Sequence, residues 1–464
     1  MFALRLIGLL LCMAVIGGCQ RDLLTTDPDH RLDFSTDTLT FDTVFTSLGS
    51  ATRYFVIRNP NDKKIRISSL RLAGGTLSPF RLNVDGQPAT ELSDVELPAG
   101  DSIYVFVAVT INPNDENNPF VVYDSVVMET NGNLQRVVLQ AWGQNAHFFY
   151  ASIIGTQDWY NDKPYVIIHS ILVDTQATLT IHPGCRIYLH ADSRFYVAGT
   201  LRVLGQPGDS VVFRGDRLEP YFVDLPGNWQ GIHLLKTSKD NVVEYAVIKE
   251  SIVGIRVDSL KVTAYPKLTL RNSIIRLTLS SGLLGITADI YAENCLIHSC
   301  GEWNVQLEYG GNYEFQNCTF ANASTIVTQH QKPVLRMSNY YYYRLQGVDY
   351  YLPADLNATF GNCIIYGTLN NELDRDAISG AAFNYSFRNC LMQLADTVNI
   401  NQPQFVDVIK NANPLFVSPD YEKQDYRLQA QSPCIDAGYD NGVLTDLDGR
   451  LRTPPPDIGC YEFF

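Results

Sequence analysis

The chain has 464 residues, of which 45% are apolar and 18% charged, and its formal net charge is −14. This apolar content is typical of a folded protein, and the length is sufficient for two or three domains. The acidic balance and the absence of any basic run exclude a nucleic-acid partner, which would need a positively charged surface. An anionic polysaccharide would also be repelled unless cations bridged it.

Residues 1–18 have the form of a secretory signal peptide, with one positive charge before an apolar run that is too short to span a membrane. The run ends in Val-Ile-Gly-Gly before Cys19, which resembles a bacterial lipobox. Processing there would leave Cys19 as a lipidated N-terminus, and the polar residues 19–31 would act as a tether. Asp22 is similar to the acidic export signal of Bacteroidetes surface lipoproteins. The resemblance implies a membrane-bound lipoprotein of the bacterial outer membrane, exposed on the cell surface or, alternatively, facing the periplasm.

From residue 32 to residue 145, short β-type runs alternate with turn clusters. One turn, Asn131-Gly132, is a strong hairpin signal because both residues tolerate a positive φ. Short strands with regular turns predict a β-sandwich. The segment resembles the immunoglobulin-like sandwiches of bacterial surface and cilia-associated proteins at residues 56–59, 97–101 and 137–143. Two roles stay open for it: glycan or protein binding, and a spacer that caps the next domain.

Four Asn-Cys pairs recur in the second half of the chain, each with an apolar residue two positions after the Cys, and a fifth copy has Ser in place of Cys. They are Asn294-Cys295, Asn317-Cys318, Asn362-Cys363, Asn389-Cys390 and Asn272-Ser273. The asparagines are 22, 23, 45 and 27 residues apart, and we interpret the interval of 45 as two periods. Self-similarity at this spacing indicates a solenoid, because each coil must bury its apolar face against its neighbours.

The pattern also predicts where each side chain of the repeat lies. The Cys and the residue two positions later share one strand face, so both should point inward as part of the core. The Asn should sit at a bend, where it tolerates the left-handed conformation and can bond to the Asn of an adjacent coil. We therefore expect a structural ladder of Asn272, Asn294, Asn317, Asn362 and Asn389 that carries no chemistry.

From residue 150 to residue 412 several short runs per period are broken by Gly or Asp, and this region resembles the right-handed parallel β-helix of the pectin lyase-like superfamily. Residues 413–464 resemble a terminal module of many bacterial secreted β-helix proteins, with matches at 413–416, 432–438, 446–450 and 457–462. We expect this module to cap the open end of the solenoid. Its two cysteines, Cys434 and Cys460, are the best candidates for a disulfide. The predicted fold is all-β: a sandwich, then a capped β-helix.

The enzymes of this superfamily are polysaccharide lyases and glycoside hydrolases, which use carboxylates and, in lyases, a basic residue. Candidate catalytic residues gather in the middle of the repeat region: Asp289, Glu293, Glu302, Glu308 and Arg271. The galacturonase-type signatures Asn-Thr-Asp, Asp-Asp and His-Gly are absent. The alternative is that these residues form a solvated polar face.

The long interval between Asn317 and Asn362 contains a tyrosine-rich stretch, which we expect to form a loop extruded from the coil. Exposed tyrosines stack on sugar rings and provide rigid contact area for a protein partner. The candidate binding residues are Tyr340, Tyr341, Tyr342, Tyr343, Tyr350 and Tyr351. The alternative is that these rings pack in the core or at an edge.

The sequence indicates no cofactor. Asp446-x-Asp448-Gly449 is similar to part of a calcium loop, so calcium is the one metal to consider. The function that fits best is a surface-anchored lipoprotein that binds a glycan or a neighbouring surface protein. The alternatives are a polysaccharide lyase or glycoside hydrolase that uses the middle acidic residues, and a purely structural surface component.

Overall fold

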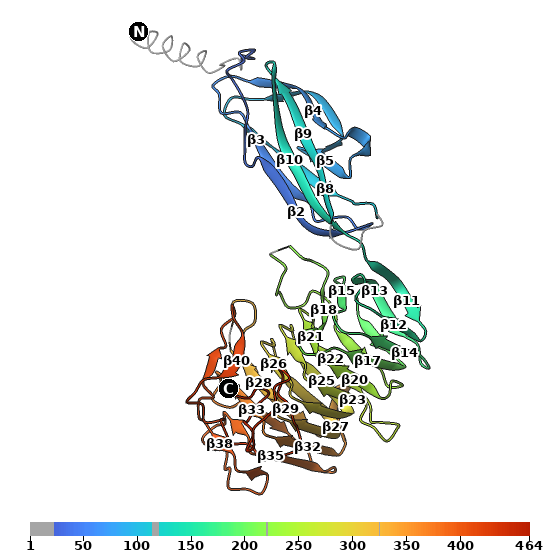
Figure 1. Ribbon diagram of the computed structural model, residues 1–464, viewed down its shortest axis with the longest axis vertical. Coiled ribbons are helices and arrows are strands. Elements are labelled where there is room, and N and C mark those ends of the chain that lie inside the picture. The colour runs from blue at the N-terminus through green and yellow to red at the C-terminus, as the bar shows by residue number, and fades with distance from the viewer. Residues whose placement is uncertain (1–22, 114–119, 220, 324) are drawn as a thin grey trace, which may run out of the picture. The chain divides into compact units, whose positions relative to one another are not determined.

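The computed structural model describes residues 23–113, 120–219, 221–323 and 325–464, and strands make up most of it (Figure 1). Among these described residues the only helical turn is η1 (Gly75–Leu77), so the predicted all-β class is confirmed. Across the same ranges no helix is long and apolar enough to cross a membrane. The chain divides into two compact units between Asn145 and Ala146.

In the first unit two five-stranded sheets enclose one apolar core. One sheet has the order β1 (Asp33–Phe34), β3 (Arg53–Arg58), β8 (Ser102–Val109), β5 (Phe80–Val84), β6 (Gln87–Ala89). The other has the order β2 (Thr38–Phe45), β10 (Asn133–Gln144), β9 (Phe120–Thr130), β4 (Ile65–Leu72), β7 (Glu91–Leu97). Alternation places one side of each strand in the core: in β8, Val105 and Val107 are fully buried, whereas Tyr104 and Phe106 are exposed. Strands β9 and β10 form the predicted hairpin at Asn131-Gly132.

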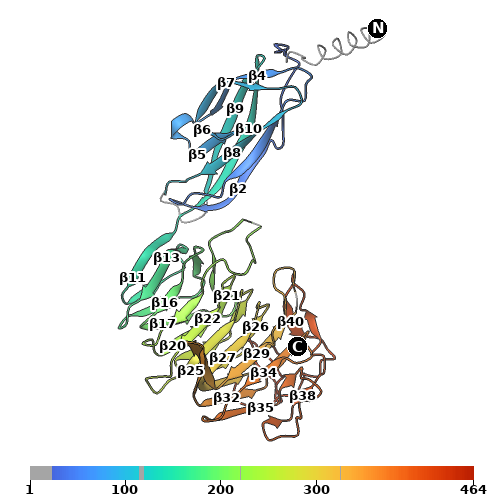
Figure 2. The same ribbon diagram turned by 180° about the vertical axis from the view of Figure 1, so that it is seen from behind.

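In the second unit 26 strands form one hydrogen-bonded sheet in which every pairing is parallel. The pairings sort into three stacks, and the chain passes from one stack to the next as it completes each coil. This is the arrangement of a β-helix-like solenoid, and both views of the ribbon show its strands layered from β11 to β38 (Figures 1 and 2).

Four long strands bend at a corner and belong to two stacks each: β11 (His147–Ile154), β13 (Tyr165–Val173), β25 (Leu283–Glu293) and β27 (Val305–Gln316). Stack A also contains β16 (Phe195–Val197), β19 (Ile232–Leu234), β22 (Ile255–Asp258), β29 (Leu335–Ser338) and β34 (Leu373–Asp376). Stack B also contains β12 (Gln157–Trp159), β14 (Thr178–Ile181), β17 (Thr200–Leu204), β20 (Asn241–Glu244), β23 (Leu268–Arg271), β32 (Leu356–Gly361), β35 (Phe383–Arg388) and β37 (Phe405–Val406). Stack C also contains β15 (Arg186–Leu189), β18 (Val211–Gly215), β21 (Ala246–Lys249), β24 (Ile274–Arg276), β26 (Leu296–His298), β28 (Thr319–Asn322), β33 (Ile364–Gly367), β36 (Leu391–Met392) and β38 (Ile409–Lys410).

The corner between stacks B and C is formed by the Asn series. All five asparagines adopt the left-handed backbone, with φ of 47° to 52°, a conformation that Asn tolerates better than most residues: Asn272, Asn294, Asn317, Asn362 and Asn389. Two direct amide bonds join the series, from Asn294 Nδ2 to Asn272 Oδ1 at 3.1 Å and from Asn362 Nδ2 to Asn317 Oδ1 at 3.5 Å. The repeat therefore marks one turn that recurs in successive coils.

The residue after each Asn closes that turn. The Cys318 thiol donates a hydrogen bond to the Gln316 carbonyl at 3.3 Å, and Cys295, Cys363 and Cys390 donate to the equivalent carbonyls. In the fifth copy the Ser273 hydroxyl donates to the Arg271 carbonyl at 2.7 Å. Either Cys or Ser can occupy this position, because each side chain supplies a hydrogen-bond donor at the same point of the turn. The four thiols are also fully buried in the core, beside stacked rings of Phe315, Phe360 and Phe387 from successive coils.

The interval of 45 residues is one coil and not two. Strand β28 pairs directly with β33, and β27 pairs directly with β32, so no unmarked coil lies between Asn317 and Asn362. The additional residues leave the coil as the hairpin of β30 (Tyr340–Leu345) and β31 (Val348–Pro353) and as the loop between β28 and β29. The prediction of two periods was wrong because an insertion near the length of one coil mimics a missing repeat.

The C-terminal segment lies along the side of the solenoid, whereas we expected it over the open end. Its apolar residues, which include Phe416 and Tyr426 of the hairpin β39 (Phe416–Ser418) and β40 (Asp425–Leu428), pack on the outer face of stack C. Both views place β40 beside β26, and Figure 1 also shows β28 next to it (Figures 1 and 2). The strands of stack C carry apolar residues on both faces, and those on the outer face, such as Ile364, are buried because the C-terminal segment covers them.

The Asn ladder is the surface on which this segment docks. Asn362 donates to the Tyr439 carbonyl at 2.8 Å and accepts from the Tyr439 amide at 3.0 Å. Asn294 donates to the Thr445 carbonyl, and Asn389 to the Ala437 carbonyl at 2.9 Å. The amides therefore bond more often to the C-terminal segment than to one another. Cys434 and Cys460 are free buried thiols in this segment, so the predicted disulfide between them is wrong.

Candidate ligand-binding groove

A groove of about 550 Å³ lies on the outer face of stack A, next to the tyrosine hairpin. Its floor is formed by side chains that point outward from neighbouring strands. In β25 Leu283 is buried and Leu284 points out, and the register continues from Leu284 to Gln306 in β27 and Arg336 in β29. Leu284 and Ile286 give the floor an apolar patch, and Gln306 adds a polar group beside it.

The wall of the groove is the hairpin β30–β31, which places tyrosines opposite one another. Tyr342 pairs with Tyr351 across the hairpin, with ring centroids 5.3 Å apart, and Tyr343 stacks on Tyr350 at 5.0 Å. Tyr341 contacts Tyr309 of the coil, with ring centroids 5.8 Å apart.

Four of the six predicted binding tyrosines are more than a third exposed: Tyr341, Tyr342, Tyr350 and Tyr351. Tyr340 and Tyr343 are half-buried. None of the six lies in the core, so they form a rigid aromatic surface, of which Tyr340, Tyr341, Tyr342 and Tyr351 line the groove.

One guanidinium at the groove edge is bound by three carboxylates. Arg336 contacts Glu308 at 2.6 Å through Nε, Asp374 at 2.5 Å through Nη1 and Asp376 at 3.2 Å through Nη2. Burial lowers the pKa of Arg336, but the hydrogen bonds and charges of Glu308 and Asp374 more than offset this and raise it above its ordinary value. Arg336 is therefore a permanent cation, and each of its three nitrogens already contacts a protein carboxylate. Tyr340 donates to Asp376 at 2.6 Å, and this bond raises the pKa of Tyr340 to about 12.

The other predicted catalytic residues do not converge on the groove. Glu293 and Arg271 form an ion pair at 3.0 Å on stack B. Glu302 lies in the turn between stacks C and A and accepts a hydrogen bond from Ser280. Of the candidates, only Glu308 reaches the groove, and its carboxylate is bonded to Arg336. The acids gathered in the sequence are thus distributed over separate faces of the solenoid.

Asp289 belongs to a second amide ladder on stack B that the sequence reasoning missed. Asn312 donates to Asp289 at 2.8 Å, Asn357 to Asn312 at 3.0 Å, and Asn384 to Asn357 at 2.9 Å. Asp289 is 4% exposed and is the acceptor at the end of this chain of bonds. Each member lies five residues before an Asn of the first ladder, so the same spacing could have revealed it.

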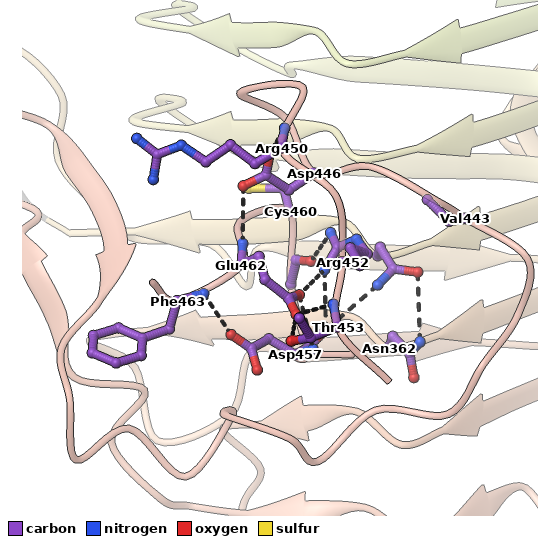
Figure 3. Close-up of polar contacts among 12 residues, drawn as sticks. Asn362, Val443, Asp446, Arg450, Arg452, Thr453, Asp457, Cys460, Glu462 and Phe463 are labelled. Atoms are coloured by element: carbon purple, nitrogen blue, oxygen red, sulfur yellow. Dashed lines mark hydrogen bonds and ion pairs between the residues drawn. The ribbon is translucent and has the colours of Figure 1, made fainter. Parts of the chain in front are cut away.

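The two predicted calcium ligands, Asp446 (Figure 3) and Asp448, lie in the C-terminal segment and are bonded to protein donors. The oxygens of Asp446 accept from the backbone amides of Arg450 at 2.8 Å and Glu462 at 3.1 Å. Asp448 binds Arg427 at 2.9 Å. Among the described residues no group of three His, Cys, Asp or Glu side chains is placed to hold a metal. Calcium at this loop stays a prediction.

Figure 3 also shows a buried ion pair that anchors the segment to the Asn ladder. Arg452 contacts Glu462 at 3.1 Å, with 3% and 1% of the two side chains exposed, and donates to Asn294 Oδ1 at 2.8 Å. Burial raises the pKa of the neighbouring Asp457 carboxyl, whose oxygens accept backbone amides. These contacts explain the acidic and basic residues of the C-terminal signature as structural groups.

Cys19, the predicted lipid anchor, falls outside the described residues, as do residues 1–18.

No family model matches the chain, and no curated protein matches it. Among solved structures, it is similar to a family 123 glycoside hydrolase from Clostridium perfringens at 7% identity, covering 26% of this chain and 30% of that chain, with a TM-score of 0.19. It is similar to the VesB protease of Vibrio cholerae at 13% identity, over 24% and 31% of the two chains, with a TM-score of 0.18. It is also similar to a PapD-like domain of human CEP192 at 12% identity, over 26% and 89%, with a TM-score of 0.18. The matches span less than a third of the first two chains, and scores this low carry no argument about function.

Proposed function

We propose that the protein binds carbohydrate in the groove between stack A and the tyrosine hairpin. The observation that carries the proposal is the combination of exposed tyrosines whose rings contact one another with an apolar floor and hydrogen-bonding groups at the edge. Aromatic faces pack on the apolar faces of sugar rings, and the Gln306 and Glu308 side chains are placed to bond to hydroxyl groups. The rings are held on a two-stranded sheet and not on a floppy loop, which lowers the cost of ordering them on binding.

The finer architecture and the location belong to the same proposal. The three-stack solenoid supports a right-handed β-helix of the pectin lyase-like type, and the two-sheet first unit supports an immunoglobulin-like spacer. The lipobox-like residues before Cys19 support lipid anchoring at the bacterial outer membrane, on the cell surface. Incorporation of labelled fatty acid into the wild type but not into Cys19→Ala would support the anchor, and equal labelling would refute it.

Binding is favoured over catalysis because the predicted acids lie on different faces and the one in the groove is paired with a cation. A depolymerisation assay on each bound glycan tests the enzyme alternative directly. Turnover that is lost in Glu308→Gln would replace the binding proposal with a catalytic one.

The proposal is tested by screening the chain from residue 20 onward on a glycan array. Tyr341→Ala combined with Tyr342→Ala should abolish binding to each positive glycan, because both rings line the groove. The matched control is Tyr265→Ala, which removes a ring that is 70% exposed on a loop away from the groove. Binding that survives the double substitution, or an array with no positive glycan, would refute the proposal and favour a protein partner or a purely structural role.

A further inference from the structure

The charged groups at the groove edge carry an excess of negative charge. Glu308, Asp374 and Asp376 all contact the single cation Arg336, so the cluster has three carboxylates for one guanidinium. Among the residues that line the groove, Glu308 and Arg336 are the only charged ones. No second cation of the lining offsets the two uncompensated carboxylates.

Arg336 already contacts three protein carboxylates, so its positive charge is more than balanced before any ligand carboxylate approaches. Its Nε and both Nη atoms already contact the three protein carboxylates, two of them at 2.6 Å or less. A ligand carboxylate that approached the other N–H groups of the Nη atoms would also approach the negative charges of Glu308, Asp374 and Asp376. Like charges at such distances repel, and a partly desolvated site increases the effect.

The tyrosines that line the groove also favour a positively charged ligand. Tyr309, Tyr340, Tyr341, Tyr342 and Tyr351 line the groove, and the rings of Tyr340 and Tyr342 both lie near Tyr351, with centroids 5.5 Å and 5.3 Å away. The face of an aromatic ring attracts a cation through its quadrupole. Tyr340 is also fixed by its hydrogen bond to Asp376, so aromatic faces and negative charge are held together.

We infer that the groove selects glycans that carry free amino groups and rejects glycans that carry uronic acids. This inference rests on the proposed carbohydrate-binding function and assigns the ligand class of that groove. The ammonium group of an amino sugar would lie between the tyrosine wall and the carboxylates of Asp374 and Asp376. The apolar face of the sugar ring would lie on Leu284 and Ile286.

The experiment compares three oligosaccharides of equal length by calorimetry: a β-1,4-linked glucosamine, its fully N-acetylated form and an oligogalacturonate. The first two share one backbone and differ only in the amino group. The measurements are made at mildly acidic pH, above the ordinary carboxylate range of about 4, so that carboxylates and amine are both charged. We expect the glucosamine oligomer to bind about tenfold more tightly than the N-acetylated form, from one cation–π contact and one ionic contact. The galacturonate should bind most weakly.

The variant that tests the cause is Asp374→Asn with Asp376→Asn, which keeps the hydrogen-bond acceptors and removes two charges. It should lose the ionic part of the preference for the amine and keep only the smaller part that comes from the tyrosine faces, while binding of the N-acetylated form is unchanged. The matched control is Asp396→Asn with Glu422→Gln, which removes two charges from exposed positions elsewhere on the solenoid unit. That control should retain the preference for the amine.

The outcomes separate the inference from the function on which it rests. If the galacturonate binds as tightly as the glucosamine oligomer, or more tightly, the amino-sugar inference is refuted and carbohydrate binding is left intact. A preference for the amine that is as large in the double Asn variant as in the wild type refutes the role of this carboxylate cluster. Failure of all three oligosaccharides to bind, together with an empty glycan array, refutes both proposals.

Discussion

The buried ion pair between Arg452 and Glu462 allows a quantitative test of how the C-terminal segment is held. Arg452 has five acceptors within 3.4 Å, of which Glu462 Oε2, Asn294 Oδ1 and the Gly459 carbonyl are the nearest. Arg452→Met removes this cation and leaves Glu462 as a buried charge without its partner. Breaking a buried pair from one side costs about 3–5 kcal/mol, a large part of the about 5–15 kcal/mol by which a typical domain is stable.

A second substitution should recover part of that loss. Glu462→Gln removes the negative charge but keeps an oxygen that can accept from Thr453, whose amide and hydroxyl are 2.9 Å from Glu462 Oε1. We expect the double variant Arg452→Met, Glu462→Gln to be about 2 kcal/mol more stable than the sum of the single effects predicts.

The assay is the rate at which the buried thiols of the C-terminal segment react with a labelling reagent. Cys434 and Cys460 are fully buried, so labelling requires the segment to open, and the labelled fraction resolved by mass spectrometry gives the free energy of local opening. Labelling of Arg452→Met that is less than about fivefold faster than wild type, roughly 1 kcal/mol, would refute the reasoning. So would strict additivity of the two substitutions.

Three further predictions concern the coils. In denaturant titration, Ser273→Cys should change the free energy of unfolding by less than about 1 kcal/mol, because the thiol can still donate to the Arg271 carbonyl. Ser273→Ala should cost about 1–3 kcal/mol, because it removes this donor and also the acceptor of the buried Ala246 amide. Equal costs of the two substitutions would contradict the turn-closing role. Burial lowers the pKa of Lys267 to about 8, so above that pH the unfolded chain binds more protons than the folded one. The free energy of unfolding of the wild type, relative to that of Lys267→Met, should therefore rise from about pH 8 to about pH 10. A difference between the two proteins that does not change with pH would contradict this. Gly231→Ala should cost more than about 3 kcal/mol because a Cβ would collide with a backbone carbonyl, whereas Gly208→Ala, also at positive φ but facing open space, should cost about 1 kcal/mol; similar thermal shifts would refute the contrast.

The period of the Asn series was enough to predict the corner of the coil. This corner needs a residue that tolerates the left-handed conformation, followed by an inward side chain with a hydrogen-bond donor. Both requirements are local, and the adjacent residues Asn294 and Cys295 meet them. The second ladder was equally local in spacing, but its members, such as Asn312, have no common neighbour that draws attention to them. Its first position carries Asp289, which composition alone presents as a candidate acid.

Long-range packing could not be predicted in the same way. Nothing near Glu308 in the sequence indicates that Arg336 will bind both Glu308 and Asp374, because insertions of irregular length separate the three residues. The lateral position of the C-terminal segment depends on the outward apolar residues of stack C, and the outward Ile364 is not distinguishable in the sequence from the inward Ile365 next to it, since both are buried isoleucines. Periodicity identifies the coil, whereas the faces that receive other segments follow from tertiary contacts.

The docking of the C-terminal segment on the Asn ladder also imposes an order on folding. Arg452 bonds to Asn294, which precedes it by 158 residues, and Asn441 bonds to Asn317, which precedes it by 124. Contacts of such long sequence separation form late, because the intervening chain must first be ordered. During synthesis the coils would assemble with the outer face of stack C still open to water, and the segment from residue 413 onward would close it only after it emerged. This segment thus acts as a completion signal, since a polypeptide interrupted before it would retain a row of uncovered aliphatic side chains and unbonded amides.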